Sequence, residues 1–262
     1  EVQDKPYRAY KWTGDYEVSQ DWYVDAAIDQ VINDFADLKG ITYTSAKNEL
    51  YNGGYKIFIN EYMKLQKILE EKYRDPYTVL SYYNENAAEK DLIQSAFIVM
   101  DYTGTVQAVV GGLGEKPGDG AFNRATQATR SPGSTMKPIS TYSLAVQKNL
   151  ITYSTLIPDE AINIGTQDEP QIWPQNYGEV WGDGPLRPAW YGVQHSLNTL
   201  AVRVGRMNTT KAMYTQLTQM LGFTTLVESD IALSPLCLGA LTNGAKLVEV
   251  AGAYQIFGNG GV

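Results

Sequence analysis

Hydrophobic and polar residues follow two periods in the first part of the chain. Apolar residues recur at three- and four-residue spacing over 22–38 and 61–74, which predicts amphipathic helices. Residues 54–60 (GYKIFIN) alternate with a period of two and predict a strand. Two β-rich runs at 95–101 and 105–112 are separated by Tyr-Thr-Gly, and this arrangement predicts a hairpin.

The rest of the chain is mostly helical in its pattern. Helical periodicity covers residues 137–148, 187–206, 210–221 and 246–257. A connection rich in Pro, Gly and Trp, residues 157–188, separates the first two of these segments. A hairpin followed by a helical block predicts an α+β fold with an antiparallel sheet flanked by helices. No later segment has the pattern of further strands for that sheet, so we expect its C-terminal strands to be missing from this chain.

Composition and charge narrow the class of protein. The 262 residues are 44% apolar, which is enough for one large domain with a core. A formal charge of −8, with no basic run longer than a pair, argues against nucleic acid as a partner. The longest apolar runs are too short to cross a bilayer, so we expect this chain to be soluble. With one cysteine, Cys237, and one histidine, His195, we expect no disulfide, no metal site and no cofactor.

One short stretch, RSPGSTMKP (130–138), places a serine and a lysine three residues apart between two prolines. Because Pro138 has no amide hydrogen, the helix must begin at about Ser134 or Thr135. Ser134 would then lie at a helix N-terminus, whose free N–H groups can stabilise an oxyanion. Lys137 would lie on the same face of the first turn, where burial and the helix dipole favour the neutral amine that acts as a base.

A second pattern supports a catalytic interpretation of the first. On its own, Ser134 could be a helix cap and Lys137 a solvated surface amine. However, Ser196-Leu197-Asn198 is the only Ser-x-Asn in the chain, and it lies within the helical block. At a bend between helices the hydroxyl could relay a proton and the amide could hold a substrate amide. The alternative for these two residues is again a helix cap.

The chain resembles the transpeptidase domain of class A penicillin-binding proteins, the bifunctional peptidoglycan synthases, over most of its length. Residues 122–138 are similar to the nucleophile region of that family, with Ser134 and Lys137 on its Ser-x-x-Lys positions. The family's lead-in is similar to LYNGGYKIFINEYMKLQKILEE (50–71), and its first hairpin to AFIVMDYTGTVQAVVGG (96–112). Its path to the Ser-x-Asn motif is similar to IWPQNY (172–177), then Gly184-Pro185, then HSLNTLAVRVG (195–205). Its helical stretch that ends in Asn-Gly-Gly is similar to LGALTNGAKLVEVAGAYQIFGNGG (238–261).

The resemblance implies a D,D-transpeptidase that cross-links peptidoglycan stem peptides. Ser134 would attack the carbonyl between the two terminal D-alanines, with Lys137 accepting its proton. D-alanine would leave, protonated through the Ser196 hydroxyl, and an amine of a neighbouring stem peptide would resolve the acyl-enzyme. β-Lactams would enter by the same attack and remain as slowly hydrolysed esters. The family acts at the extracytoplasmic face of the bacterial cell membrane, within the cell envelope.

The resemblance also implies residues that bind substrate. Asn198 would hold the substrate amide, and Trp173 and Asn176 would line the cleft, with packing as the alternative for Trp173. The oxyanion donors would be the backbone N–H of Ser134 and one N–H from a strand near the third motif of the family.

The sequence departs from the family at both ends. The Lys-Thr-Gly motif is absent, and so are the glycosyltransferase domain and membrane anchor expected upstream. We therefore expect residues 1–50 to be a linker or adaptor and residues 51–262 to be the N-terminal and helical part of the transpeptidase domain. A C-terminal fragment that carries Lys-Thr-Gly is an expected partner.

The sequence also allows other interpretations of the function. Within the same fold, the chain could be a D,D-carboxypeptidase or a β-lactam sensor, but the lead-in and the approach to Ser134 favour the synthase. It could also be an inactive fragment or a non-catalytic scaffold: the missing third motif favours this alternative, whereas the intact Ser134, Lys137, Ser196 and Asn198 argue against it. In the glycine-rich loop at 111–130, the glycine spacing fits neither a dinucleotide site nor a P-loop, so we expect a surface loop there and not a nucleotide site.

Overall fold

The computed structural model of the protein describes residues 20–80 and 93–261. Residues 1–19 of the predicted linker, and residues 81–92 and 262 of the predicted transpeptidase part, lie outside the described residues. The division of the chain at residue 50 stays a prediction.

Helices dominate the N-terminal region. Its helices are α1 (Trp22–Lys39), α2 (Tyr43–Asn52), α3 (Met63–Arg74) and α4 (Pro76–Val79). The Asp21 carboxylate accepts the Val24 N–H at the start of α1, and Gly40 ends the helix in the left-handed conformation that glycine adopts most easily. The helices predicted at 22–38 and 61–74 are confirmed.

The predicted hairpin is also confirmed. Strand β1 (Phe97–Met100) pairs antiparallel with β2 (Val106–Val110), and Phe97 lies opposite Val110. The buried amide of Gln66 on α3 holds the outer edge of β2, because it donates to the Val109 carbonyl and accepts the Val109 N–H, both at 2.8 Å. Helix α3 is thereby fixed to the hairpin.

The prediction of a strand at 54–60 is wrong. These residues have no assigned strand structure, and most of the apolar side chains are exposed. Just beyond this segment, Tyr62 donates its N–H to the Gln107 carbonyl of β2, at 2.9 Å. Alternation alone did not make a strand, because a ladder also requires a partner along the whole segment.

Three pairs of short antiparallel strands occur beyond the hairpin, and none joins its sheet within the described residues. They are β3 (Thr129–Arg130) with β8 (Ala245–Lys246), β4 (Leu156–Pro158) with β7 (Leu186–Pro188), and β5 (Ile162–Asn163) with β6 (Ile172–Trp173). Strands of two or three residues are too short to show a period in the sequence.

The helical block contains the segment with Ser134 and Lys137. Its elements are the 3-10 turn η2 (Gly133–Thr135), the π-helical η3 (Lys137–Tyr142), α5 (Ser143–Gln147), α6 (Ala189–Gln194), α7 (Asn198–Asn208), α8 (Thr210–Thr215), the π-helical η4 (Gln216–Met220), the 3-10 turn η5 (Glu228–Asp230), α9 (Leu233–Leu238), α10 (Leu247–Tyr254) and the 3-10 turn η6 (Gln255–Phe257). The helices predicted over 137–148, 210–221 and 246–257 are confirmed, whereas the segment at 187–206 is two helices with a break at 195–197. The α+β class is confirmed.

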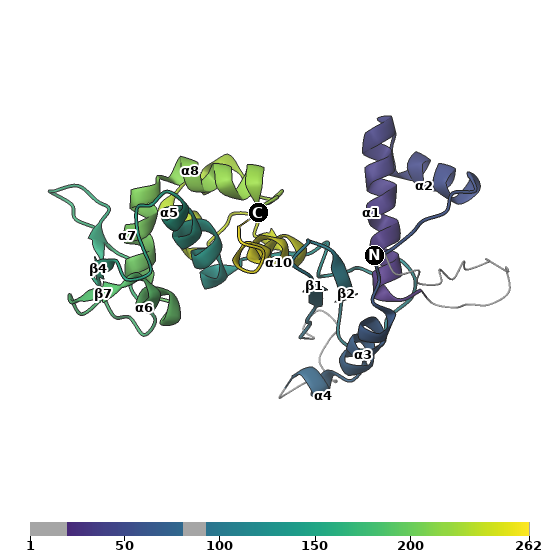
Figure 1. The fold of residues 1–262 in the computed structure, drawn as a ribbon, viewed down its shortest axis with the longest axis horizontal. Coiled ribbons are helices and arrows are strands. Elements are labelled where there is room, and N and C mark those ends of the chain that lie inside the picture. Colours follow the sequence, from purple (N-terminus) through teal and green to yellow (C-terminus); the bar gives the residue numbers. More distant parts are fainter. Residues whose placement is uncertain (1–19, 81–92, 262) are drawn as a thin grey trace.

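The helical block and the N-terminal helices lie at opposite ends of an elongated molecule (Figure 1). Helix α10 lies between them and packs beside β1. The main core of the helical block is built around η3, α7, α8 and α9, with buried side chains that include Met136, Ile139, Val202, Met213, Leu217 and Leu236.

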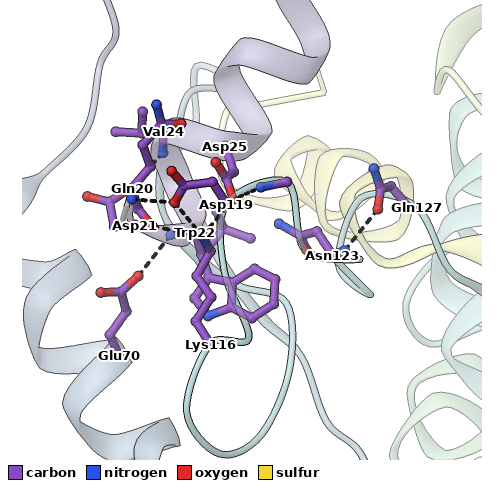
Figure 2. Close-up of polar contacts among 12 residues, drawn as sticks. Gln20, Asp21, Trp22, Val24, Asp25, Glu70, Lys116, Asp119, Asn123 and Gln127 are labelled. Carbon is purple, nitrogen blue, oxygen red and sulfur yellow. Dashed lines mark hydrogen bonds and ion pairs between the residues drawn. The ribbon is translucent and has the colours of Figure 1, made fainter. Parts of the chain in front are cut away.

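A separate polar cluster fixes the start of α1 to the loop that follows β2 (Figure 2). The Lys116 ammonium forms an ion pair with Asp25 at 2.7 Å and donates to the Gln20 carbonyl at 2.8 Å. It also lies 5.6 Å from the centre of the Trp22 ring. Asp25 in turn accepts the Gly120 N–H at 2.7 Å. The glycine-rich loop is therefore held against α1 by a charged pair.

Candidate active site

Ser134 lies on a tight turn with an exposed side chain. Gly133, with φ 55°, begins the 3-10 turn η2, so helical structure starts one residue before the predicted position. The backbone of Gly239, at the end of α9, packs closely against this turn, since a Cβ on Gly239 would lie 2.2 Å from the Gly133 carbonyl oxygen. A glycine is therefore required at 239, and α9 supports the turn that presents Ser134.

The backbone changes its hydrogen-bond pattern directly after Ser134. Pro138 supplies no amide hydrogen, and η3 runs as a π-helix in which Ser143 donates its N–H to the Pro138 carbonyl. Single π-helical turns occur frequently at functional sites. Met136 and Ile139 are fully buried in the core and flank Lys137 and Pro138, so they fix the orientation of this turn.

Lys137 is a buried amine surrounded by neutral oxygen atoms. Only 2% of the residue is exposed. Its Nζ donates to the Ser196 carbonyl at 2.6 Å, to Ser196 Oγ at 3.1 Å and to Asn198 Oδ1 at 2.5 Å. Burial lowers the pKa of Lys137 from 10.5 to about 8. The amine is therefore able to lose its proton near neutral pH, as the sequence predicted.

Ser196 occupies a backbone conformation that usually selects glycine. It follows α6 with φ 52°, and its N–H donates to the Val193 carbonyl while the Leu197 N–H donates to the Gly192 carbonyl. These bonds form a Schellman motif, whose left-handed position is commonly glycine. Retaining serine there costs about 1 kcal/mol or more. In this conformation, the Ser196 hydroxyl lies within hydrogen-bond distance of Lys137.

Asn198 begins α7 and is held from two sides. Its Nδ2 donates to the Gln175 carbonyl at 2.7 Å, and its backbone N–H donates to Asn176 Oδ1 at 2.7 Å. With Nδ2 committed to Gln175, the Oδ1 atom is the one that accepts the hydrogen bond from Lys137. The break between α6 and α7 thus brings a hydroxyl and an amide to one amine.

The structure brings Lys137, Ser196 and Asn198 together and places Ser134 on the turn that leads into Lys137. No hydrogen bond joins the Ser134 hydroxyl to Lys137 in the described part of the chain. Trp173 lies in β6, half-buried against the core of the helical block. Asn176 is 8% exposed and bonds to protein groups on three sides. Substrate-binding roles for Trp173 and Asn176 stay predictions.

Two buried residues next to this site were missed by sequence reasoning. Asp159 is 5% exposed and Thr199 is fully buried, and both bond to Asn176. Thr199 directly follows Asn198, which is the one signal that could have pointed to it. Asp159 is distant in the sequence and is brought to the site by the end of β4.

The arrangement combines an exposed hydroxyl, a buried amine and a second hydroxyl, which suits nucleophilic acyl transfer. Within residues 20–80 and 93–261, no group of His, Cys, Asp and Glu side chains could hold a metal ion. Nor does any helix in those ranges have the length and apolar character needed to span a membrane.

Comparison with known proteins gives the family. The sequence profile of the penicillin-binding protein transpeptidase domain matches residues 94–234, which include Ser134, Lys137, Ser196 and Asn198. Penicillin-binding protein 1A of Clostridium botulinum is 28% identical over 93% of this chain. The chain spans 30% of the length of that relative.

Solved structures agree on the fold. Penicillin-binding protein 1A of Haemophilus influenzae matches 63% of this chain and 23% of its own chain, with a TM-score of 0.51 and 27% identity. The transpeptidase domain of penicillin-binding protein 3 from Burkholderia pseudomallei matches 79% of this chain and 59% of its own, with a TM-score of 0.54 and 19% identity. The chain belongs to the transpeptidase-domain family of the penicillin-binding proteins.

Proposed function

We propose that the chain is the acyl-transfer part of a D,D-transpeptidase of peptidoglycan synthesis. The observation that carries the proposal is the Lys137 amine, buried among oxygen atoms of Ser196 and Asn198 and directly following the exposed turn that contains Ser134. Its lowered pKa suits a base that works near neutral pH. Membership of the family supports the substrate class.

In the proposed reaction, Ser134 Oγ attacks the carbonyl carbon between the two terminal D-alanines of a stem peptide. Lys137 takes the hydroxyl proton, and the C–N bond breaks as D-alanine leaves with a proton relayed through the Ser196 hydroxyl. The resulting ester on Ser134 is attacked by an amine of a second stem peptide, which forms the cross-link and restores the serine hydroxyl. A β-lactam opens its amide bond on Ser134 in the same way and stays attached.

The protein would act outside the cytoplasm, at the extracytoplasmic face of the bacterial cell membrane where peptidoglycan is assembled. In a transpeptidase the acceptor is an amine, whereas in a D,D-carboxypeptidase it is water. Adding a D-amino acid acceptor to the acyl-enzyme separates these two functions, because only transpeptidation forms the exchanged peptide. A β-lactam sensor would form the acyl-enzyme and process neither acceptor at a useful rate.

The proposal is tested by intact mass of the natural protein after incubation with a fluorescent penicillin. We expect one adduct on Ser134, loss of that adduct in Ser134→Ala, and an unchanged adduct in Ser154→Ala, which alters an exposed serine outside the site. Labelling that persists in Ser134→Ala, or no labelling of the natural protein, would overturn the assignment in favour of another nucleophile or a non-catalytic scaffold.

A further inference from the structure

A buried polar network lies directly behind the Ser-x-Asn segment. Asp159 Oδ1 accepts hydrogen bonds from Thr199 Oγ1 at 2.5 Å and from Asn176 Nδ2 at 3.1 Å. Asn176 Oδ1 accepts the backbone N–H groups of Asn198 at 2.7 Å and of Thr199 at 3.2 Å. The three network side chains belong to residues that are at most 8% exposed.

We propose that Asp159, Asn176 and Thr199 are positioning residues that hold Asn198, and through it Lys137, in the geometry required for acylation. This inference rests on the proposed function. It assigns Asn176 a place behind the cleft instead of in contact with substrate.

The network supplies hydrogen-bond acceptors for the first N–H groups of α7 from outside the helix. The first N–H groups of a helix have no partner within it, and Leu197, which precedes the helix, has no side chain that can cap it. Asn176 takes that role with one oxygen for two N–H groups. The Asp159 carboxylate lies beside the same end of the helix, where the macrodipole favours negative charge. The position of Asn198 is therefore set by groups on another segment.

Two consecutive residues, Gln175 and Asn176, hold the side chain and the backbone of Asn198. The Gln175 carbonyl accepts its side-chain Nδ2 and Asn176 accepts its backbone N–H. Residue 176 is itself anchored, because its N–H donates to the Val180 carbonyl at 2.7 Å. The only side-chain atom left to face Lys137 is Oδ1, at 2.5 Å. A shift of the 175–176 segment would move an acceptor of the catalytic amine.

The carboxylate is tied to the scaffold as well. Asp159 follows β4, which packs beside α7, and its backbone accepts the Gly184 N–H at 3.0 Å (Figure 1). Gly182 leaves room for it, since a Cβ at that position would lie 2.1 Å from the Asp159 carbonyl oxygen. The short pair β4–β7 thus acts as a support for the active site.

The test compares rate constants of acylation by a fluorescent penicillin in the natural protein and its variants. Thr199→Val removes the hydroxyl that bonds to Asp159 and keeps the shape of the side chain. We expect acylation to slow by about tenfold to a hundredfold, as for a small misplacement of a reacting group. Thr199→Ser should restore most of the rate. Thr141→Val is the matched control, because Thr141 is equally buried and lies outside the network.

Circular dichroism under the assay conditions measures the folded fraction of each variant, and rate constants are compared among variants that are fully folded. If Thr199→Val gives too little folded protein, Asp159→Asn, which keeps an acceptor and removes the charge, is expected to slow acylation by a smaller factor. A wild-type rate constant in these variants, or an equal loss in Thr141→Val, would overturn the inference. Absence of labelling in the unsubstituted protein would instead overturn the proposed function.

Discussion

Lys137 is buried and Lys116 is partly buried, and the surroundings of these two lysines differ. Lys116, with 11% of its side chain exposed, lies 2.7 Å from the Asp25 carboxylate and close to the Trp22 ring (Figure 2). Lys137, with 2% of the residue exposed, has a carbonyl, a hydroxyl and an amide oxygen around it, and forms no ion pair within the described residues. The Lys116 amine therefore has a charged partner, whereas the Lys137 amine is hydrogen-bonded to neutral oxygen atoms.

The comparison shows how the surroundings of a lysine suit it to different roles. A carboxylate compensates the charge of Lys116, and the pair joins two segments of the chain. Neutral acceptors orient Lys137 without compensating its charge fully, so burial dominates and lowers its pKa to about 8. Such a shift is typical of an active-site base.

Exchanging Lys137, the proposed base, is expected to have the largest effect on activity. Lys137→Met keeps a long apolar stem in the buried position and removes the amine. Acylation by a fluorescent penicillin should slow by about a hundredfold or more, as expected for loss of a positioned base. The rate constant is followed by fluorescence of the labelled protein, with thermal unfolding as the control for folding. An unchanged rate constant would mean that Lys137 has only a structural role.

Exchanging the structural lysine should give the opposite result. Lys116→Met leaves the Asp25 carboxylate buried without its charged partner, which costs about 3–5 kcal/mol in free energy of unfolding. Urea unfolding followed by circular dichroism measures this loss. The acylation rate constant of the folded molecules should stay that of the natural protein, because the cluster lies with the N-terminal helices, at the opposite end of the molecule from the helical block (Figure 1).

A second substitution sharpens this prediction. Asp25→Asn removes the buried carboxylate charge. In that background, Lys116→Met should lower the free energy of unfolding by less than it does in the natural protein. Equal losses in the two backgrounds would show that Lys116 stabilises the protein by packing on Trp22 and not by its ion pair.

Much of the architecture could be predicted because it depends on local signals. Helix α1 carries its own period, its Asp21 cap and its Gly40 stop, and the β1–β2 hairpin has a clear pattern with a glycine in its turn. Pro138 limits where the helix can begin, and the predicted shift of Lys137 toward the neutral amine, from burial and the helix dipole, agrees with its lowered pKa.

The remaining features depend on contacts that are distant in the sequence. Residues 54–60 alternate like a strand, yet no strand within residues 20–80 and 93–261 pairs along them. The break that puts Ser196 in a left-handed conformation is hidden inside one helical period, because a serine stands where glycine would have marked it. Asp159 reaches α7 only through the β4–β7 pairing, for which two- and three-residue strands give no signal.

The most direct test of the account is the pH dependence of the acylation rate constant, measured with a fluorescent penicillin in the natural protein. Below its pKa the Lys137 amine carries a proton and cannot accept another, so the rate constant should fall with decreasing pH by about tenfold per pH unit. We predict a midpoint at about 8, with a plateau above it. A flat profile, or a midpoint near the ordinary lysine value of 10.5, would contradict the role of Lys137 as the base that activates Ser134.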